Sequence, residues 1–292
     1  MKTYRSIETV LAPPPPHMVG DGFRVHHFFP GGPDFPMDRM SPFFMLDYNA
    51  LTMLPPSPKP KGVGVHPHRG FETVTIAYKG RIAHHDSAGN SGVIGEGDVQ
   101  WMTAGSGVLH KEFHEEEFSK AGGAFQMVQL WVNLPAKYKM HAPKYQEITS
   151  AQMGRVALQK GHVEIIAGEF QGVKGPASTF SPVHLYNLKL ESGDRFETTF
   201  PSTYRVALLA ISGNARYQDG TAIPQDHFAL LRNDGDNILI ESEGPATVLL
   251  LAGEPLHEPI AAYGPFVMNT KAEILQAYDD FQAGKFGKLE ED

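Results

Sequence analysis

The stretch His66-Pro-His68-Arg-Gly-Phe-Glu72 carries two histidines separated by one residue, and a second stretch, Gly107-Val-Leu-His110-Lys-Glu112, repeats this spacing with a histidine and a glutamate. In a β-strand, side chains at positions i and i+2 point to the same face. Two such strands that face each other would therefore bring three imidazoles and one carboxylate to a single point. This donor set is typical of a divalent transition metal that keeps coordination positions open for a ligand.

The composition excludes some kinds of binding partner and some kinds of metal ligand. Lys and Arg number 25 against 33 Asp and Glu, so the formal net charge is −8. An acidic chain has no general attraction for phosphate backbones or anionic membranes, and we therefore expect no direct binding to nucleic acid. The chain has no cysteine and 14 histidines, so any transition metal must be held by imidazoles and carboxylates.

The N-terminal sequence, Met1-Lys-Thr-Tyr-Arg-Ser-Ile-Glu8, lacks the apolar core of a signal peptide. The chain also has no apolar run of about 18 residues, the length that would indicate a membrane-spanning helix. We therefore expect a soluble protein without a membrane partner. It is expected in the cytoplasm, or also in the nucleus if the source is a eukaryote, and its expected assembly state is a monomer.

Many short apolar runs, separated by 30 glycines and 23 prolines, are typical of sheets joined by turns. At 292 residues the chain is long enough for two domains, and the strand pattern begins again after Lys144. We predict an all-β protein with one β-domain at 1–144 and a second, metal-free one at 145–292. The second domain is expected to end in a short helix, because Thr270-Lys-Ala-Glu273 is a capping-box pattern that precedes apolar residues at helical spacing.

The two ligand stretches resemble the two sequence motifs of the cupin superfamily. The first motif reads His66-x-His68-x3-Glu72-x7-Gly80, and the second runs from Gly97-Asp98 to Ala104-Gly-Ser-Gly107-x2-His110. Longer strings are similar to the pirin family, a group of two-domain cupins. They are His66-Pro-His-Arg-Gly-Phe-Glu-Thr-Val74, Gln100-Trp-Met-Thr-Ala-Gly105, Gln129-Leu-Trp-Val-Asn-Leu134 and Tyr263-Gly-Pro-Phe-Val-Met-Asn269.

This resemblance covers nearly the whole chain. It implies a bicupin, with two cupin-type β-barrel or jelly-roll domains and one metal, usually iron, in the N-terminal domain. The ligands of the family correspond to His66, His68, His110 and Glu112 in this sequence. Fe(2+) is the expected metal, with Ni, Co, Mn, Cu and Zn as alternatives.

Glu72 competes with Glu112 for the place of the fourth ligand. It occupies the position of the glutamate ligand in many other cupins, and it shares the even parity of His66 and His68. A bulge at Gly70 would reverse the parity of the residues that follow it. We therefore favour Glu112, mainly because of the family resemblance.

Other histidines lie close to the ligand stretches. His114 shares a face with His110 and could line the pocket, although a position at the rim, beside the acidic run Glu115-Glu116-Glu117, is favoured. His84 and His85 precede a polar loop, and one of the two must face away from any interior. A surface hairpin is favoured for this pair.

A metal with open positions could bind a substrate that has adjacent hydroxyl and keto oxygens, and a neighbouring carboxylate could take the hydroxyl proton. The resulting enolate is electron-rich enough to react with O2. The family resemblance implies an oxidoreductase similar to quercetin 2,3-dioxygenase, which opens a flavonol ring with O2 and releases carbon monoxide. Glu112 would then serve as ligand and as catalytic base.

Two other functions stay open at this point. Some members of the pirin family behave as metal-binding, redox-sensitive regulators, which implies a non-enzymatic role exerted through protein partners in transcription or metabolism. Other cupin chemistry, such as the isomerisation of a sugar phosphate, is a third candidate. A flavonol-like substrate with O2 is the partner that we expect.

Overall fold

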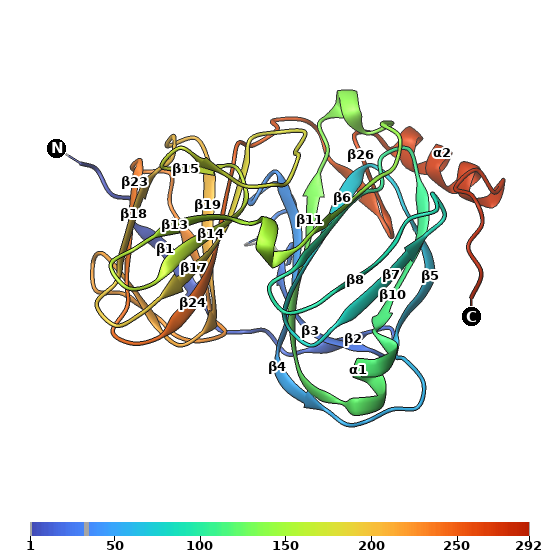
Figure 1. The fold of residues 1–292 in the computed structure, drawn as a ribbon. Helices are drawn as coiled ribbons and strands as arrows, with labels where there is room; N and C mark the ends of the chain where they lie inside the picture. The colour runs from blue at the N-terminus through green and yellow to red at the C-terminus, as the bar shows by residue number, and fades with distance from the viewer. Residues whose placement is uncertain (1, 32–34, 292) are drawn as a thin grey trace. The chain divides into compact units, whose positions relative to one another are not determined.

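The structure is a computed structural model that describes residues 2–31 and 35–291. The chain forms two compact units (Figure 1). Unit 1 consists of Met1–Pro14, Arg39–Pro42 and Ala151–Pro255, and unit 2 of Pro15–Asp38, Phe43–Ser150 and Leu256–Asp292. Both units are built mainly from antiparallel strands, so the predicted all-β fold is confirmed.

Unit 2 contains both candidate ligand stretches. Its strands are β2 (His17–Val19), β3 (Phe23–Phe29), β4 (Phe43–Leu54), β5 (Gly62–His68), β6 (Phe71–Lys79), β7 (Ile82–Asp86), β8 (Ser91–Ile94), β9 (Val99–Thr103), β10 (Val108–His114), β11 (Gly123–Asn133), β12 (Lys144–Ile148), β25 (Ala261–Tyr263) and β26 (Phe266–Met268). The helical segments of this part are α1 (Glu116–Ala121), a 3-10 turn at Ala136–Tyr138 and α2 (Lys271–Gln282), and a further 3-10 turn, Ser150–Gln152, leads into unit 1.

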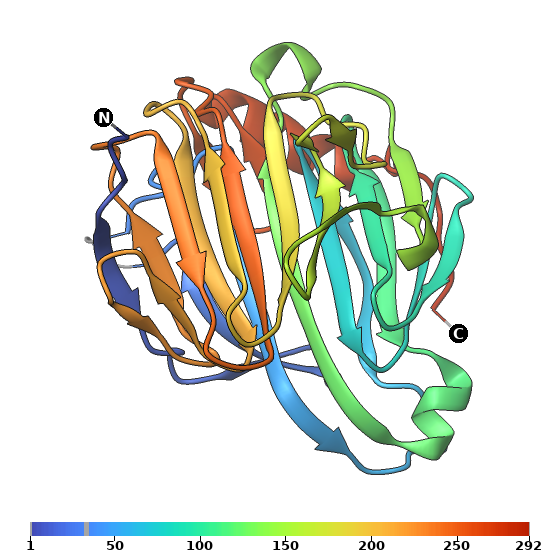
Figure 2. The same ribbon diagram turned by 60° about the vertical axis from the view of Figure 1, so that its left-hand side comes forward.

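The strands of unit 2 form two main sheets. The larger has the order β12-β9-β6-β11-β4-β3-β2 and the smaller has the order β5-β10-β7-β8. Figure 2 shows the long strands β4 and β11 side by side, with α1 at the start of β11. Apolar residues of both sheets share one core cluster, which includes Val25, Ile82 and Phe125, so the sheets pack face to face around a common interior.

Unit 1 has the same plan. Its strands are β1 (Ile7–Leu11), β13 (Gly154–Ala157), β14 (His162–Ala167), β15 (Glu169–Phe170), β16 (Val173–Lys174), β17 (Val183–Leu190), β18 (Arg195–Thr199), β19 (Arg205–Ser212), β20 (Ala215–Tyr217), β21 (Ala222–Ile223), β22 (Phe228–Leu231), β23 (Asn237–Glu241) and β24 (Ala246–Gly253). They form a seven-stranded sheet, β1-β22-β19-β24-β17-β14-β13, a four-stranded sheet, β18-β23-β20-β21, and the pair β15-β16.

The two units match strand for strand in their four-stranded sheets, where β18 and β23 hold the places that β5 and β10 hold in unit 2. Phe196 of β18 lies opposite Ile240 of β23, and both are buried in the core of unit 1 with Ile238. Apolar side chains therefore fill the interior at the places where β5 and β10 carry histidines.

The ends of the chain depart from the predicted division at residue 144. The N-terminal strand β1 pairs with β22 and completes the large sheet of unit 1, whereas residues 256–292 belong to unit 2. The terminal helix, which was predicted as the end of the second domain, thus belongs by its contacts to unit 2. The alternation of apolar residues marks a strand, but it does not state which sheet the strand joins.

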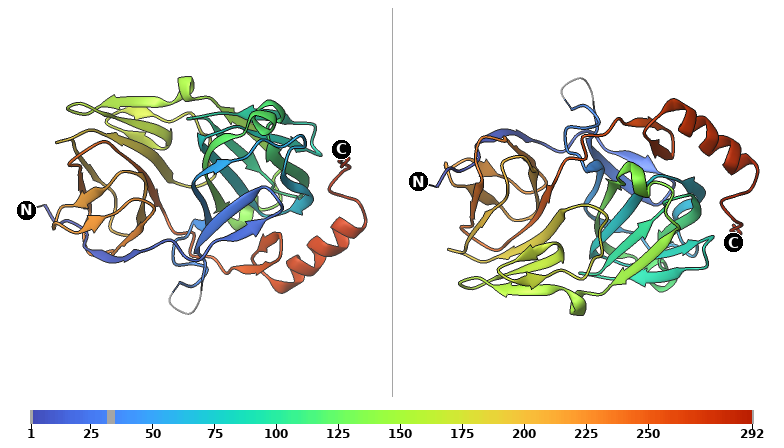
Figure 3. Two further views of the ribbon diagram at one scale, coloured as in Figure 1. Left: turned by 90° about the horizontal axis from the view of Figure 1, so that it is seen from below. Right: turned by 90° about the horizontal axis from the view of Figure 1, so that it is seen from above.

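The terminal helix α2 itself was predicted, with its cap. Thr270 accepts a hydrogen bond from the backbone N–H of Glu273, and the Glu273 carboxylate accepts one from the backbone N–H of Thr270, which is the complete capping box. Ile274 packs in a cluster with Phe266 and Met268, and α2 lies beside the β25–β26 hairpin in both views of Figure 3. In the described part of the chain, no helix combines the length and apolar character needed to span a membrane.

Candidate metal centre

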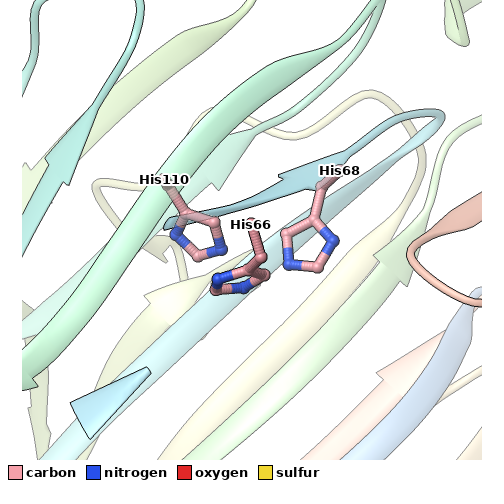
Figure 4. A group of neighbouring side chains, drawn as sticks. All are labelled: His66, His68 and His110. Atoms are coloured by element: carbon pink, nitrogen blue, oxygen red, sulfur yellow. The ribbon is translucent and has the colours of Figure 1, made fainter. Parts of the chain in front are cut away.

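Three histidine rings converge on one point in the interior of unit 2. In the pairing of β5 with β10, His66 lies directly opposite His110, and side chains of opposed residues share a face of the sheet. The ring centroids of His66 and His110 are 4.2 Å apart, and His68 lies 4.8 Å from each of them. Figure 4 shows the three rings turned toward one another.

The hydrogen bonds leave one nitrogen of each ring available for a metal. Nδ1 of His66 donates to the carbonyl of Gly64 at 2.8 Å, and Nδ1 of His68 donates to the carbonyl of Pro265 at 3.3 Å. Each Nε2 then carries a lone pair. His110 is only 1% exposed, and neither of its ring nitrogens has a hydrogen-bond partner among the described residues. Because a buried polar atom without a partner is costly, the orphaned His110 ring fits a metal ligand.

The electrostatics favour the neutral form of these imidazoles. Burial lowers the pKa of His66, and it lowers the pKa of His68 and His110 well below the usual value, with a further lowering from the neighbouring His66. Neutral imidazoles bind metals without first losing a proton. At neutral pH the three rings are therefore in the protonation state that a divalent transition metal requires.

Glu112 adds a carboxylate beside these rings. Glu112, His84 and His110 each offer one ligand atom, and these atoms lie within 4.8 Å of one another. Three side chains orient the carboxylate: Oε1 accepts from Gln100 Nε2 at 2.6 Å and Thr75 Oγ1 at 3.1 Å, and Oε2 accepts from the half-buried Gln129 Nε2 at 2.7 Å. His110 thus belongs to one group with His66 and His68 and to a second with His84 and Glu112, and Glu112 lines the same cavity as His66 and His68.

Glu72, the rival candidate, lies on the other face of its strand. Gly70 has φ +89° and lies between the end of β5 and the start of β6. This break turns the even-numbered residues after it to the opposite face, as we expected for a bulge at Gly70. Thr75 of β6 donates into the site, so Glu72, three residues earlier, points to the opposite face. There it accepts a hydrogen bond from Thr103 Oγ1 at 2.7 Å. Neither group of metal-type side chains in the described residues includes it.

Glu72 gives a pH-dependent contribution to stability. Burial raises its pKa from 4.5 to about 7. Between these values the unfolded chain releases the proton that the folded protein keeps. The contribution of Glu72 to stability is therefore most favourable below about pH 4.5 and becomes about 3 kcal/mol less favourable as the pH rises to about 7. We expect Glu72→Gln to remove this fall. Urea unfolding at pH 5 and pH 8 checks it, since equal pH dependence in both proteins would contradict the assignment.

His84 belongs to the site, and the predicted surface hairpin is wrong for this residue. It is 0% exposed and lies opposite Glu112 in the pairing of β7 with β10. Its ring centroid is 5.4 Å from that of His110, and its Nε2 lies 3.3 Å from Asp86 Oδ2. The hairpin does occur at this point, but β7 pairs with β10 on one edge and turns His84 inward. His85 is half-buried.

His114 is buried as well, which corrects the predicted rim position. Its ring lies among Phe23, Phe118 and Phe125, at centroid distances of 5.3, 6.1 and 4.8 Å. Burial lowers its pKa. It borders a different cavity from the one that opens onto the metal-type side chains.

A cavity of about 180 Å³ opens onto the candidate metal centre. His66, His68 and Glu112 form one wall. The remaining wall is mainly apolar and carries two further polar side chains; its residues are Val19, Phe23, Val25, Met45, Asp47, Val63, Met127, Gln129 and Trp131. Trp131 stacks on Phe71 with ring centroids 4.1 Å apart, and its ring lies 5.1 Å from that of His68. A ligand at the metal would lie between aromatic and apolar surfaces.

Two similarly built β-units, of which one encloses three imidazoles and a carboxylate, define the protein as a two-domain cupin. The sequence comparisons agree with this class. The family model described as Pirin matches residues 22–132, and the model described as Pirin C-terminal cupin domain matches residues 185–287. The chain belongs to the pirin family.

Several relatives are similar over most of their length. The Pseudomonas aeruginosa protein named "Putative quercetin 2,3-dioxygenase PA2418" is 44% identical, over 92% of this chain and 94% of that protein. A crystal structure of quercetin 2,3-dioxygenase from Acinetobacter baumannii has a TM-score of 0.92 at 44% identity, covering 99% of this chain and 100% of that one. A bacterial pirin from Escherichia coli, solved with nickel(II), has a TM-score of 0.65 at 20% identity, covering 85% and 100%, and shows the likeness of fold.

Proposed function

We propose that this protein is a metal-dependent dioxygenase that opens a flavonol ring with O2, and that His66, His68, His110 and Glu112 hold the metal. The observation that carries the proposal is the His110 ring, which is buried with both nitrogens unpaired among the described residues and lies beside His66 and His68. The similarity to proteins named quercetin 2,3-dioxygenase supports the reaction class. We propose Fe(2+) as the native metal.

The residues around the cavity suit such a substrate. When bound, a divalent iron would supply a Lewis acid for two adjacent substrate oxygens and a redox centre for O2. Phe23 and Trp131 offer flat aromatic surfaces to a planar ring system. At about 180 Å³ the cavity is smaller than typical sites for drug-sized ligands, which measure roughly 300–1,000 Å³. It therefore fits the ring with the hydroxyl and keto groups and leaves the remainder of a flavonol at the mouth.

Turnover tests the proposal directly. Protein purified without O2 and loaded with Fe(II) is expected to consume O2 and quercetin together and to release carbon monoxide. An oxygen electrode, the loss of flavonol absorbance and a carbon monoxide assay measure the three quantities, with iron-treated His110→Ala as the control. A protein that binds iron but leaves quercetin and O2 unchanged would overturn the proposal and would favour a regulator that acts through protein partners.

A further inference from the structure

One carboxylate in the wall of the cavity is not used by the metal centre described above. Asp47 of β4 is 7% exposed and lines the same cavity as His66, His68 and Glu112. Its Oδ1 lies 2.7 Å from Nδ1 of His27. Within the described part of the chain, Oδ2 has no donor. Asp47 therefore presents one free acceptor atom beside the candidate metal centre.

His27 anchors this carboxylate as an ion pair. Its Nδ1 contacts Asp47 Oδ1, and its Nε2 contacts the backbone carbonyl of Pro30 at 2.7 Å. Both contacts are with oxygen acceptors, so both ring nitrogens must donate, which requires the protonated imidazole. The hydrogen bond to Asp47 accordingly raises the pKa of His27. Asp47 is thus held in one orientation by a charge-assisted hydrogen bond.

Asp47 also lies in a row of polar side chains that crosses the large sheet of unit 2. The residues lie opposite one another on successive strands, so their side chains share the interior face. From β3 to β9 the row is His27, Asp47, Gln129, Thr75 and Gln100. The last three all donate to Glu112. Asp47 therefore lies next to Gln129, one of the three side chains that hold Glu112, and it is the one residue of this row with a carboxylate.

The contacts of Glu112 make it a poor place for a substrate proton. Its two oxygens already accept three hydrogen bonds, from Thr75, Gln100 and Gln129. A proton on either oxygen would displace a donor and leave a buried amide or hydroxyl without its partner, which costs free energy. Asp47 Oδ2 can accept a proton without breaking a bond to the protein. The base role that the family resemblance implied for Glu112 thus suits Asp47 better.

We propose that Asp47 is a substrate-binding catalytic residue, whose Oδ2 accepts the hydrogen bond and then the proton of the hydroxyl next to the keto group of the substrate. This inference rests on the proposed dioxygenase function. In the step, the substrate O–H bond breaks and an O–H bond forms on Asp47, while the substrate oxygen keeps the electron pair. The proton later returns to the ring-opened product, so the residue ends the cycle unchanged.

Binding of two ligands tests this role without turnover. Quercetin and luteolin differ only in the hydroxyl next to the keto group, which luteolin lacks. Zinc-loaded protein under nitrogen serves for titration, because zinc has no redox chemistry. We expect Asp47→Asn to weaken quercetin binding by about tenfold or more, the effect of losing a hydrogen bond to a charged group, and to leave luteolin binding within about twofold. In the Fe(II) enzyme, turnover of quercetin should fall by about a hundredfold.

Two further variants keep the result interpretable. His27→Gln removes the anchor but keeps the carboxylate, so it should lower the preference for quercetin over luteolin in the same direction and by less. Met53→Leu changes an exposed residue of the same strand β4, and should leave the preference unchanged. An Asp47→Asn protein that weakens both flavonoids equally, or neither, overturns the role of Asp47. Wild-type protein that shows the preference but never consumes O2 overturns the dioxygenase function instead.

Discussion

His110→Ala is expected to yield a folded protein that binds divalent metal at least about a hundredfold more weakly. Removing a residue that only hydrogen-bonds to a metal ligand already lowers metal affinity by about 10- to 100-fold, and removing the ligand itself should cost no less. The centroids of the three rings lie within 4.8 Å of one another. Removal of the most buried ring takes away the imidazole that β10 contributes to the metal centre. Metal analysis after dialysis against a metal buffer measures the change. His85→Ala, on the neighbouring strand β7, is the matched control and should bind as wild type does.

The melting temperature gives this experiment a second measurement. In the absence of metal, wild type keeps a buried imidazole with two unpaired nitrogens, so the metal-free variant should melt no more than slightly below metal-free wild type. Added metal should raise the melting temperature of wild type and leave the variant unchanged, because only a ligand that binds the folded state stabilises it. Full metal content in His110→Ala would exclude this ring as a ligand.

The same assay separates the two glutamates. Glu112→Gln keeps the shape of the side chain but removes the charge, and should lower metal content. Glu72→Gln should not, because Glu72 faces the other side of β6, toward Thr103. Loss of metal from Glu72→Gln alone would reverse the assignment.

The sequence was sufficient for features that depend on a few consecutive residues. The shared face of His66 and His68 follows from strand parity, and the reversal before Glu72 follows from a glycine that adopts φ +89°. The capping box of α2 lies within four residues. Each of these depends on local backbone geometry, which neighbouring residues determine.

Pairing between distant strands could not be predicted in this way. His84 enters the site only because β7 lies beside β10, with His84 opposite Glu112. Asp47 enters it because β4 pairs with β11, where Asp47 lies opposite Gln129. A signal was present for Asp47, since a charged residue inside the strongly apolar segment Phe43–Leu54 indicates a buried polar function. The sequence did not state which strands would be neighbours, and therefore could not connect these residues with the ligands.

A buried lysine stabilises the turn that follows the first ligand pair. Lys139 is 1% exposed, and its Nζ donates to the carbonyl of Gly70 at 2.8 Å, to Asn133 Oδ1 at 2.6 Å and to the carbonyl of Val267 at 2.7 Å. It thus joins the glycine turn after His68 to β26 and to the end of β11. Three acceptors depend on one side chain, and none of them can turn to solvent at this depth.

Lys139→Met is expected to lower the free energy of unfolding by about 3 kcal/mol, because methionine has a similar length but offers no hydrogen-bond donor. Each buried acceptor left unpaired costs about 1–3 kcal/mol, and part of this cost is offset because the variant no longer has to desolvate a buried amine. Urea unfolding measures the loss. Lys137→Met, an exposed lysine of the same 3-10 turn, should change stability by less than about 0.5 kcal/mol. Because Gly70 follows His68 so closely, the Lys139 variant should also bind metal more weakly. A variant with the stability of wild type would show that the three acceptors find other donors.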